Sequence, residues 1–147
     1  MIKVDYAALV AAALTARERA YAPYSHFSVG AALLSADGRI FHGCNIENAA
    51  YPVTLCAERA AFAAAWSAGV RDVVALAVVA DTAAPVSPCG MCRQVLAEFL
   101  DGADDDLHIT LLNDRGEQIV TTLRAIFPGI FDMKQLESGQ TAKKDAQ

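Results

Sequence analysis

The stretch TLCAERAAFAAAW (residues 54–66) predicts a helix packed in the core, with three chemically active side chains at its start. Alanines and bulky apolar residues follow Arg59, and Gly69 is a typical helix end. Cys56, Glu58 and Arg59 stand at the start, although charged side chains are rarely buried unless they are paired. The beginning of this helix therefore needs a chemical explanation, and the neighbouring sequence offers one.

Helices and strands are predicted to alternate on both sides of this stretch. The predicted helices cover residues 5–20, 56–68 and 89–100, and the predicted strands cover 26–35, 40–48, 73–80, 107–113 and 117–122. The Asp37-Gly38 pair is typical of a hairpin turn. The order α-β-β-α-β-α-β-β predicts an α/β fold, a three-layer α/β/α sandwich around a mixed sheet. Residues 1–136 are expected to form one domain, and residues 137–147 a flexible tail.

The composition is apolar for a globular protein. Hydrophobic residues make up 54% of the 147 residues and the mean hydropathy is +0.28, so some apolar surface is expected to lie between subunits. No apolar run approaches the ~18 residues of a membrane-spanning helix. No signal peptide is evident, so we expect a cytoplasmic location without a membrane partner. The net charge of −5 argues against nucleic acid as a partner, because it repels phosphate backbones.

A second motif, PCGMC (residues 88–92), places Cys89 and Cys92 three positions apart at the start of the third predicted helix. Residues at this spacing share a helical face, so both sulfurs can reach one metal ion. Helix N-termini also favour thiolate, the form that binds metal. Taken alone, the pair fits a metal site and a redox site equally well.

Cys56 favours the metal site. Three thiolates with an open fourth position are typical of a catalytic zinc site, whereas a structural site needs a fourth protein ligand. Cys44, His42 or His108 could supply that ligand, although all three are more simply explained as strand residues. Positions i and i+2 do not face each other on a regular helix. Cys56 is therefore expected at the helix entrance, outside full helical geometry, with Glu58 pointing toward the other cysteines.

Two arginines follow the cysteines closely. Zinc with three thiolates carries a formal charge of −1, which acidifies a bound water less than a neutral site does. Arg59 and Arg93 are each close to a cysteine in sequence. Both are expected to draw charge from the thiolates, together with the two helix N-termini.

These motifs together resemble the cytidine deaminases. The pattern C-x-E followed by P-C-x-x-C is the zinc deaminase signature. The segments AYAPYSHFSVGAALL (20–34), GCNIENAAY (43–51), CAER (56–59) and PCGMCRQ (88–94) resemble the members that act on free nucleosides. The resemblance covers about residues 20–132, almost the whole predicted domain. Editing deaminases and deoxycytidylate deaminases generally carry His at the position of Cys56.

The resemblance implies an enzyme of pyrimidine salvage. It would hydrolyse cytidine and deoxycytidine to uridine and deoxyuridine and release ammonia. One zinc ion per subunit would be bound by Cys56, Cys89 and Cys92, and Glu58 would shuttle protons between water and the ring. The Ser87 carbonyl would accept a hydrogen bond from the leaving ammonia.

The resemblance also implies substrate contacts and an assembly. Phe27 would pack on the pyrimidine ring, and Asn45 and Glu47 would hydrogen-bond the ribose hydroxyl. The chain would form a homotetramer with active sites at subunit interfaces, where Tyr51 and Phe131 would reach a neighbour's site. The alanine-rich helix over 56–68 fits close packing between subunits.

Two alternatives stay open on the sequence. A relative that acts on the cytosine-containing antibiotic blasticidin S would share the zinc motifs. A structural zinc protein or thiol-redox protein would share the cysteines, but it would leave Glu58, Asn45 and Glu47 without a role. The sequence gives no preference between cytidine and deoxycytidine, and it assigns no role to Cys44.

Overall fold

A computed structural model describes residues 5–100, 105–133 and 135–137 of the chain. The elements are α1 (Tyr6–Arg17), β1 (Val29–Ser35), β2 (Ile40–Cys44), the 3₁₀ helix η1 (Tyr51–Val53), α2 (Ala57–Ser67), β3 (Val73–Ala80), α3 (Gly90–Ala97), β4 (His108–Asn113), β5 (Gln118–Thr122) and α4 (Leu123–Ile126). The predicted order of the longer elements is confirmed, and the short helices η1 and α4 are additions. Apart from Glu137, the predicted tail lies outside the described residues.

The strands form one mixed sheet in the order β2-β1-β3-β4-β5. β1 runs antiparallel to both β2 and β3. β3 and β4 are parallel, and α3 lies in the connection between them. β5 returns antiparallel to β4. The single parallel pair makes the sheet mixed, as predicted.

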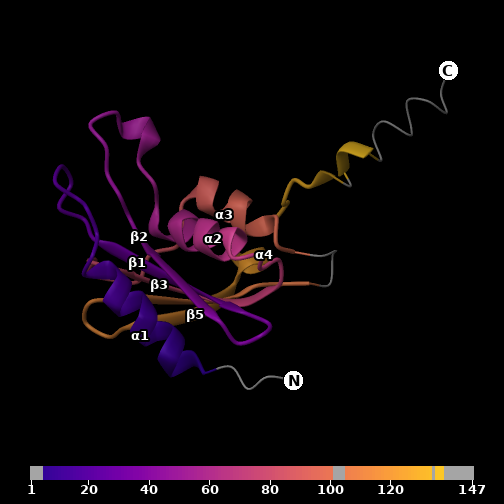
Figure 1. Ribbon diagram of the computed structural model, residues 1–147, viewed down its shortest axis with the longest axis horizontal. Helices are drawn as coiled ribbons and strands as arrows, with labels where there is room; N and C mark the ends of the chain where they lie inside the picture. The colour runs from indigo at the N-terminus through magenta and orange to yellow at the C-terminus, as the bar shows by residue number, and fades with distance from the viewer. Residues whose placement is uncertain (1–4, 101–104, 134, 138–147) are drawn as a thin grey trace.

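Helices cover both faces of this sheet and complete three layers (Figure 1). On one face, Leu9 and Ala13 of α1 are buried in a cluster with sheet residues such as Val79. On the other face, α2 and α3 contribute Ala61 and Leu96 to a larger cluster. The predicted α/β/α sandwich is therefore correct. Within the described ranges no helix is long and apolar enough to cross a membrane.

The packing of α2 on β2 is closer than side chains would allow. A Cβ atom on Gly43 would lie 2.4 Å from the backbone nitrogen of Ala61 and 2.7 Å from the carbonyl oxygen of Ala57. Only glycine allows this approach, because both obstacles belong to the helix backbone. Gly43 thus fixes the distance of α2 from the sheet, and with it the start of α2.

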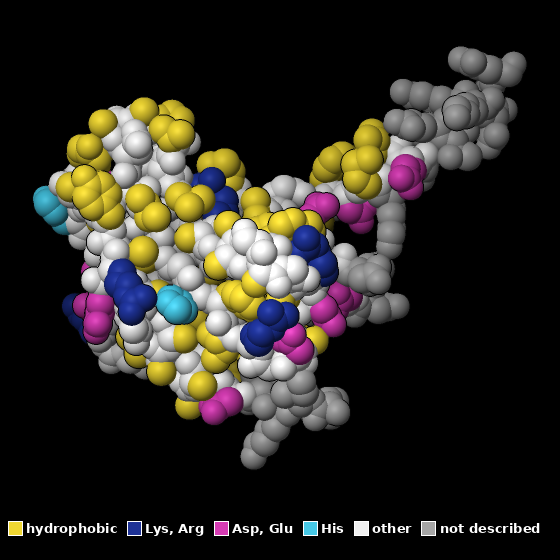
Figure 2. Space-filling view, viewed as in Figure 1, with side chains coloured by type: hydrophobic (Ala, Val, Ile, Leu, Met, Phe, Trp, Pro, Cys, Tyr) yellow, Lys and Arg dark blue, Asp and Glu magenta, His cyan; other side chains and the backbone are white. Residues whose placement is uncertain are grey.

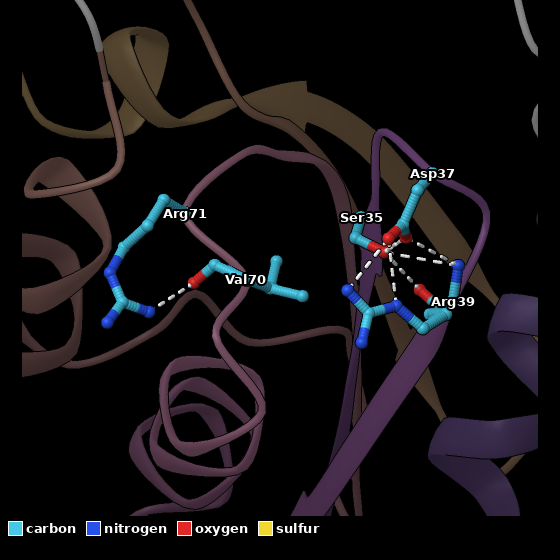
Figure 3. Close-up of polar contacts among 5 residues, drawn as sticks. All are labelled: Ser35, Asp37, Arg39, Val70 and Arg71. Carbon is cyan, nitrogen blue, oxygen red and sulfur yellow. Dashed lines mark hydrogen bonds and ion pairs between the residues drawn. The ribbon is translucent and has the colours of Figure 1, made fainter.

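The β1–β2 hairpin closes at the turn that the sequence predicts. The Asp37 carboxylate accepts a hydrogen bond from Arg39 Nε at 2.8 Å, and the Ser35 hydroxyl accepts one from the Arg39 backbone N–H at 3.1 Å (Figure 3). The bonds from Arg39 and Ser35 hold the pKa of Asp37 below its usual range. Gly38 completes the turn with φ +89°. At the opposite ends of these strands, Val29 of β1 and Asn45, which follows β2, line the site described next.

Candidate metal centre and active site

Two helix N-termini carry the three cysteines. Cys56 is the N-cap of α2, with extended backbone angles of φ −74° and ψ 153°. Cys89 is the N-cap of α3, with φ −63° and ψ 165°. Cys92 lies buried in the first turn of α3. The prediction that Cys56 lies at the helix entrance, outside helical geometry, is confirmed.

The three sulfur atoms form a cluster of the size that zinc requires. All three lie within 4.8 Å of one another. Cys56 Sγ is 3.9 Å from Cys89 Sγ, and Cys89 Sγ is 3.4 Å from Cys92 Sγ. Two tetrahedral ligands with Zn–S bonds of about 2.3 Å lie ~3.8 Å apart. The observed spacing fits a zinc ion bound by three thiolates.

The described residues offer no fourth protein ligand to this cluster, since no other His, Cys, Asp or Glu belongs to it. Cys44 instead directs its thiol to the carbonyl oxygen of Arg19, at 3.3 Å. His42 and His108 lie on β2 and β4 and are exposed. A zinc ion held by the three cysteines would therefore keep a fourth position for a water molecule or a substrate atom, as in catalytic rather than structural zinc sites.

The electrostatic environment favours thiolate at Cys56. Hydrogen bonds from the Cys92 thiol and from Arg59 lower the pKa of Cys56 to about 5, and they outweigh the opposing effect of burial. The pKa of Cys92 is raised in turn, because its proton is held against Cys56 and because the thiol is buried. A negative charge thus resides among the sulfurs near neutral pH, which suits a cation.

The two arginines have different surroundings. Arg59 Nη2 lies 3.5 Å from Cys56 Sγ and donates to the Thr54 carbonyl oxygen at 2.9 Å. Arg93 donates to the carbonyl oxygens of Pro88, at 2.8 Å, and Ile126, at 2.6 Å. It ties the loop before Cys89 to α4. Its effect on thiolate charge stays a prediction.

Glu58 lies in the first turn of α2 with only 5% of its surface exposed. Burial raises the pKa of its carboxyl group, and the negative charge of Cys56 adds to the rise. A hydrogen bond with the Cys92 thiol acts in the opposite direction. The carboxyl group therefore faces the cysteines, as expected. A raised pKa also suits a group that must both gain and lose a proton near neutrality.

A pocket of about 340 Å³ opens above these groups. It is lined by Cys56, Glu58 and Cys89 and by Phe27, Asn45 and Glu47, together with Ser25, Val29, Thr54, Ala57, Val78, Val86 and Ser87. The structure thus brings residues from four separate sequence motifs to one cavity. The cavity is large enough for a small organic molecule.

Two comparisons of sequence agree on the same family. Residues 4–103 match the family described as the cytidine and deoxycytidylate deaminase zinc-binding region. The chain is 55% identical to a cytidine deaminase of Sporosarcina psychrophila over 133 residues, which are 90% of this chain and 96% of that protein. It is 50% identical to a cytidine deaminase of Halalkalibacterium halodurans, also over 133 residues, 90% of this chain and 98% of that protein.

The chain belongs to the cytidine deaminase family. Solved structures agree with this assignment. The cytidine deaminase of Burkholderia pseudomallei superposes with a TM-score of 0.81 at 47% identity, over 87% of this chain and 100% of that chain. The cytidine deaminase of Mycobacterium tuberculosis gives a TM-score of 0.74 at 41% identity, over 88% and 99%. The family region described as zinc-binding contains all three clustered cysteines.

Two of the predicted cytidine deaminase site residues lie away from this pocket within the chain. Tyr51 belongs to η1, is 68% exposed, and packs edge-on against Tyr24 with ring centroids 5.8 Å apart. Phe131 follows α4, is 55% exposed, and its carbonyl oxygen accepts a hydrogen bond from Gln94 at 3.0 Å. Neither side chain lines the cavity. Their predicted roles need a second subunit.

The site also contains residues for which the sequence predicted no role. Ser25 lines the pocket beside Glu47, and Val86 closes the wall next to Ser87. Asn113, at the end of β4, donates a hydrogen bond to the Ala83 carbonyl oxygen at 3.1 Å and thereby holds the loop that carries Val86. The segment YAPYSHF contains Ser25, but nothing in its spacing distinguishes that serine from other loop residues.

Proposed function

We propose that this cytidine deaminase family member hydrolyses cytidine and deoxycytidine to uridine and deoxyuridine and releases ammonia. The observation that carries the proposal is the shared cavity. It is lined by the buried Glu58 carboxyl group, by Cys56 and Cys89 of the sulfur cluster, and by the polar residues Asn45 and Glu47. A nucleoside carries a reacting amine on its pyrimidine and hydroxyl groups on its ribose, and the lining offers groups suited to both.

The reaction at the pyrimidine ring uses one metal ion and one carboxylate. When bound by Cys56, Cys89 and Cys92, zinc supplies a Lewis acid that makes a nucleophile from water near neutral pH. Glu58 takes the proton of the attacking water and delivers it to ring N3, which makes C4 of the pyrimidine electrophilic. It then moves a second proton to the departing amine. The carbonyl oxygen of Ser87 accepts a hydrogen bond from the ammonia.

The binding side of the pocket orients the nucleoside. Phe27 packs against the pyrimidine ring, and the Asn45 amide and Glu47 carboxylate bind the ribose hydroxyl. The lining of the cavity supports a neutral nucleoside over a nucleotide. Its ionisable members, Glu47, Glu58 and the cysteines Cys56 and Cys89, are acidic, and the described lining residues include no Lys or Arg that could receive a phosphate.

A homotetramer with active sites at its interfaces is the assembly that we propose. The arm over residues 45–56 exposes Ile46, Tyr51 and Val53, at 47%, 68% and 66% of their surfaces. Figure 2 shows hydrophobic side chains gathered on this arm. Phe131 and Met133 are exposed on the segment after α4, which projects from the body in Figure 1. Apolar segments of this kind fit interfaces with other subunits.

A cytoplasmic location and a single deaminase domain over residues 1–136 complete the proposal. The cytoplasm keeps thiols reduced, and the three zinc ligands must be free thiols rather than disulfides. All four cysteines of the chain are free in the structure. The described strands form one sheet, with one core cluster between the sheet and α1 and the other between the sheet and α2 and α3.

A substrate panel tests the proposed function. Purified protein is incubated with cytidine, deoxycytidine, deoxycytidylate, cytosine and blasticidin S, and loss of the cytosine chromophore and release of ammonia are followed. We expect turnover of both nucleosides and at least tenfold lower kcat/KM for the other three compounds, about 1.4 kcal/mol in the transition state. Preferred turnover of deoxycytidylate or blasticidin S would contradict the proposal.

A further inference from the structure

Ser25 connects Glu47 and Phe27, two residues that line the pocket. Its hydroxyl donates a hydrogen bond to Glu47 Oε1 and accepts one from the Phe27 backbone N–H at 3.1 Å. The other carboxylate oxygen of Glu47 accepts the N–H groups of Tyr24, at 2.9 Å, and Ser25, at 3.2 Å. One hydroxyl group therefore links the orientation of the carboxylate to the backbone that carries the aromatic ring.

The backbone between Ser25 and Phe27 is arranged for this link. His26 has φ +56°, which is uncommon for a residue other than glycine. Its N–H donates to the Ala22 carbonyl oxygen at 3.0 Å, and the turn brings the Phe27 N–H back to the Ser25 hydroxyl. On the far side, the Phe27 carbonyl oxygen accepts a hydrogen bond from Asn45 Nδ2 at 2.7 Å. Both peptide groups of Phe27 are thus held by neighbouring polar side chains.

We propose that Ser25 is a positioning residue for nucleoside binding, which holds the Glu47 carboxylate and the Phe27 ring in a fixed mutual orientation. The inference rests on the proposed function, because it takes Glu47 and Phe27 as substrate contacts. Ser25 itself is exposed at the rim of the pocket. Its removal would therefore free two substrate-binding groups without opening the core.

The charge state of Glu47 adds a second consequence. The hydrogen bond from Ser25 lowers the pKa of Glu47 most, followed by the backbone N–H groups of Tyr24 and Ser25 and by the charge of His26. An ionised carboxylate is a stronger acceptor for a ribose hydroxyl than a protonated one. Loss of the Ser25 hydroxyl raises the pKa of Glu47. As the pH is lowered, the variant therefore loses nucleoside affinity at a higher pH than the wild type does.

Binding of uridine, which needs no turnover, tests the proposal together with cytidine kinetics. The zinc-loaded full chain is compared with Ser25→Ala, Ser25→Thr and the control Thr15→Ala, whose hydroxyl lies on the exposed part of α1. Loss of a hydrogen bond to a charged group typically weakens an interaction by about one to two orders of magnitude, so we expect roughly 10- to 100-fold higher Kd and KM for Ser25→Ala. We expect kcat to change less than about threefold, because Glu58 and the sulfur cluster are untouched.

The remaining variants separate positioning from folding. Ser25→Thr keeps the hydroxyl and should restore most of the affinity, Thr15→Ala should match the wild type, and zinc content should equal one per chain throughout. In Glu47→Ala, the further change Ser25→Ala should cost less than it does alone, because one of the two contacts of the Ser25 hydroxyl is already absent. The pH below which Kd begins to rise should be higher than in the wild type for Ser25→Ala, and unchanged for Ser25→Thr and Thr15→Ala.

Three outcomes would overturn the role of Ser25. They are an unchanged Kd in Ser25→Ala, a loss confined to kcat, and additive losses in the double variant. Failure of the wild type to bind uridine would remove the proposed function and this inference together. A wild type that deaminates cytidine while Ser25→Ala binds uridine normally would refute the positioning role alone.

Discussion

At the scale of single residues, Glu58 has the least replaceable proposed role. Its carboxyl group is buried against the sulfur cluster, where burial raises its pKa. Glu58→Gln keeps the shape of the side chain but cannot accept a proton, so we expect kcat to fall by about 10²–10⁴-fold. Zinc content, measured by atomic spectroscopy, should stay at one ion per chain. Turnover close to that of the wild type would reject Glu58 as the proton shuttle.

Arg59 is expected to act through the thiolate that it contacts. Its guanidinium lies 3.5 Å from Cys56 Sγ, and it is one of the groups that lower the pKa of that thiol. Groups that support metal ligands typically change metal affinity by about 10–100-fold when removed. We expect Arg59→Ala to lose zinc to a competing chelator at correspondingly lower chelator concentration.

Arg59→Lys is the matched control for that experiment, because it retains the positive charge. It should hold zinc more tightly than Arg59→Ala. Equal zinc affinities of the wild type and Arg59→Ala would show that this arginine does not compensate the thiolate charge.

Sequence motifs were sufficient to predict the sulfur cluster and the buried Glu58 carboxyl group beside it. Local spacing predicts that Cys89 and Cys92 share one face of a helix. The approach of Cys56, 33 positions before Cys89, was predicted from the chemistry of a three-thiolate zinc site and from the family resemblance. The hydrogen bonds of Ser25 could not be predicted in the same way. They depend on two loops, around residues 25 and 47, that approach each other only in the folded sheet.

At the scale of elements, the site depends on how closely α2 packs against β2. The Cβ atom of an alanine at position 43 would press on the backbone of α2, at Ala57 and Ala61. Overpacking of this kind typically costs about 1–3 kcal/mol. We expect Gly43→Ala to lower the free energy of unfolding by that amount and to reduce kcat/KM, because the start of α2 must shift.

Gly90→Ala provides the control for Gly43→Ala. A Cβ atom there meets nothing within 4 Å, and the residue begins α3. Its stability, measured by urea unfolding, should equal or exceed that of the wild type. Wild-type stability of Gly43→Ala would show that α2 can be displaced from β2 without cost.

Most helices and strands were predictable because they are long periodic segments, whereas the residues at which they begin and end were harder to predict. The predicted strand over residues 40–48 ends at Cys44. The side-chain amide of the next residue, Asn45, accepts a hydrogen bond from the Val29 N–H at 2.8 Å and donates one to the Phe27 carbonyl oxygen. These side-chain contacts take the place of further strand pairing at this point. The helices η1 and α4 have 3 and 4 residues, too few to show helical periodicity in the sequence.

At the scale of the whole molecule, strand order was the feature that the sequence could not give. β3 lies between β1 and β4, and these pairings join residues far apart in the chain. Such contacts depend on the collective fit of the sheet rather than on local patterns. The three-layer arrangement was predictable because it follows from alternating helices and strands.

The proposed tetramer predicts that subunits share their active sites. Phe131 lies outside its own chain's pocket, so Phe131→Ala should raise KM by damaging a neighbour's site. Glu58→Gln damages a subunit's own site. Tetramers are then reassembled from a mixture of Phe131→Ala and Glu58→Gln subunits. Some sites in them combine Glu58 of one subunit with Phe131 of its neighbour. Those sites should regain near-normal kcat/KM.

Light scattering should give the mass of four chains for each variant before and after mixing. Activity of the mixture equal to the sum of its unmixed components would contradict a role for Phe131 across an interface. A monomer with full activity would contradict the shared site as a whole.

The central claim is that this chain deaminates cytidine by means of a metal ion held on Cys56, Cys89 and Cys92. The most direct test measures uridine formation by the purified full chain before chelation, after chelation and after zinc is returned. We predict complete loss of turnover without metal and full recovery at one zinc ion per chain. Undiminished turnover by the metal-free chain, or no uridine from the zinc-loaded chain, would contradict the claim.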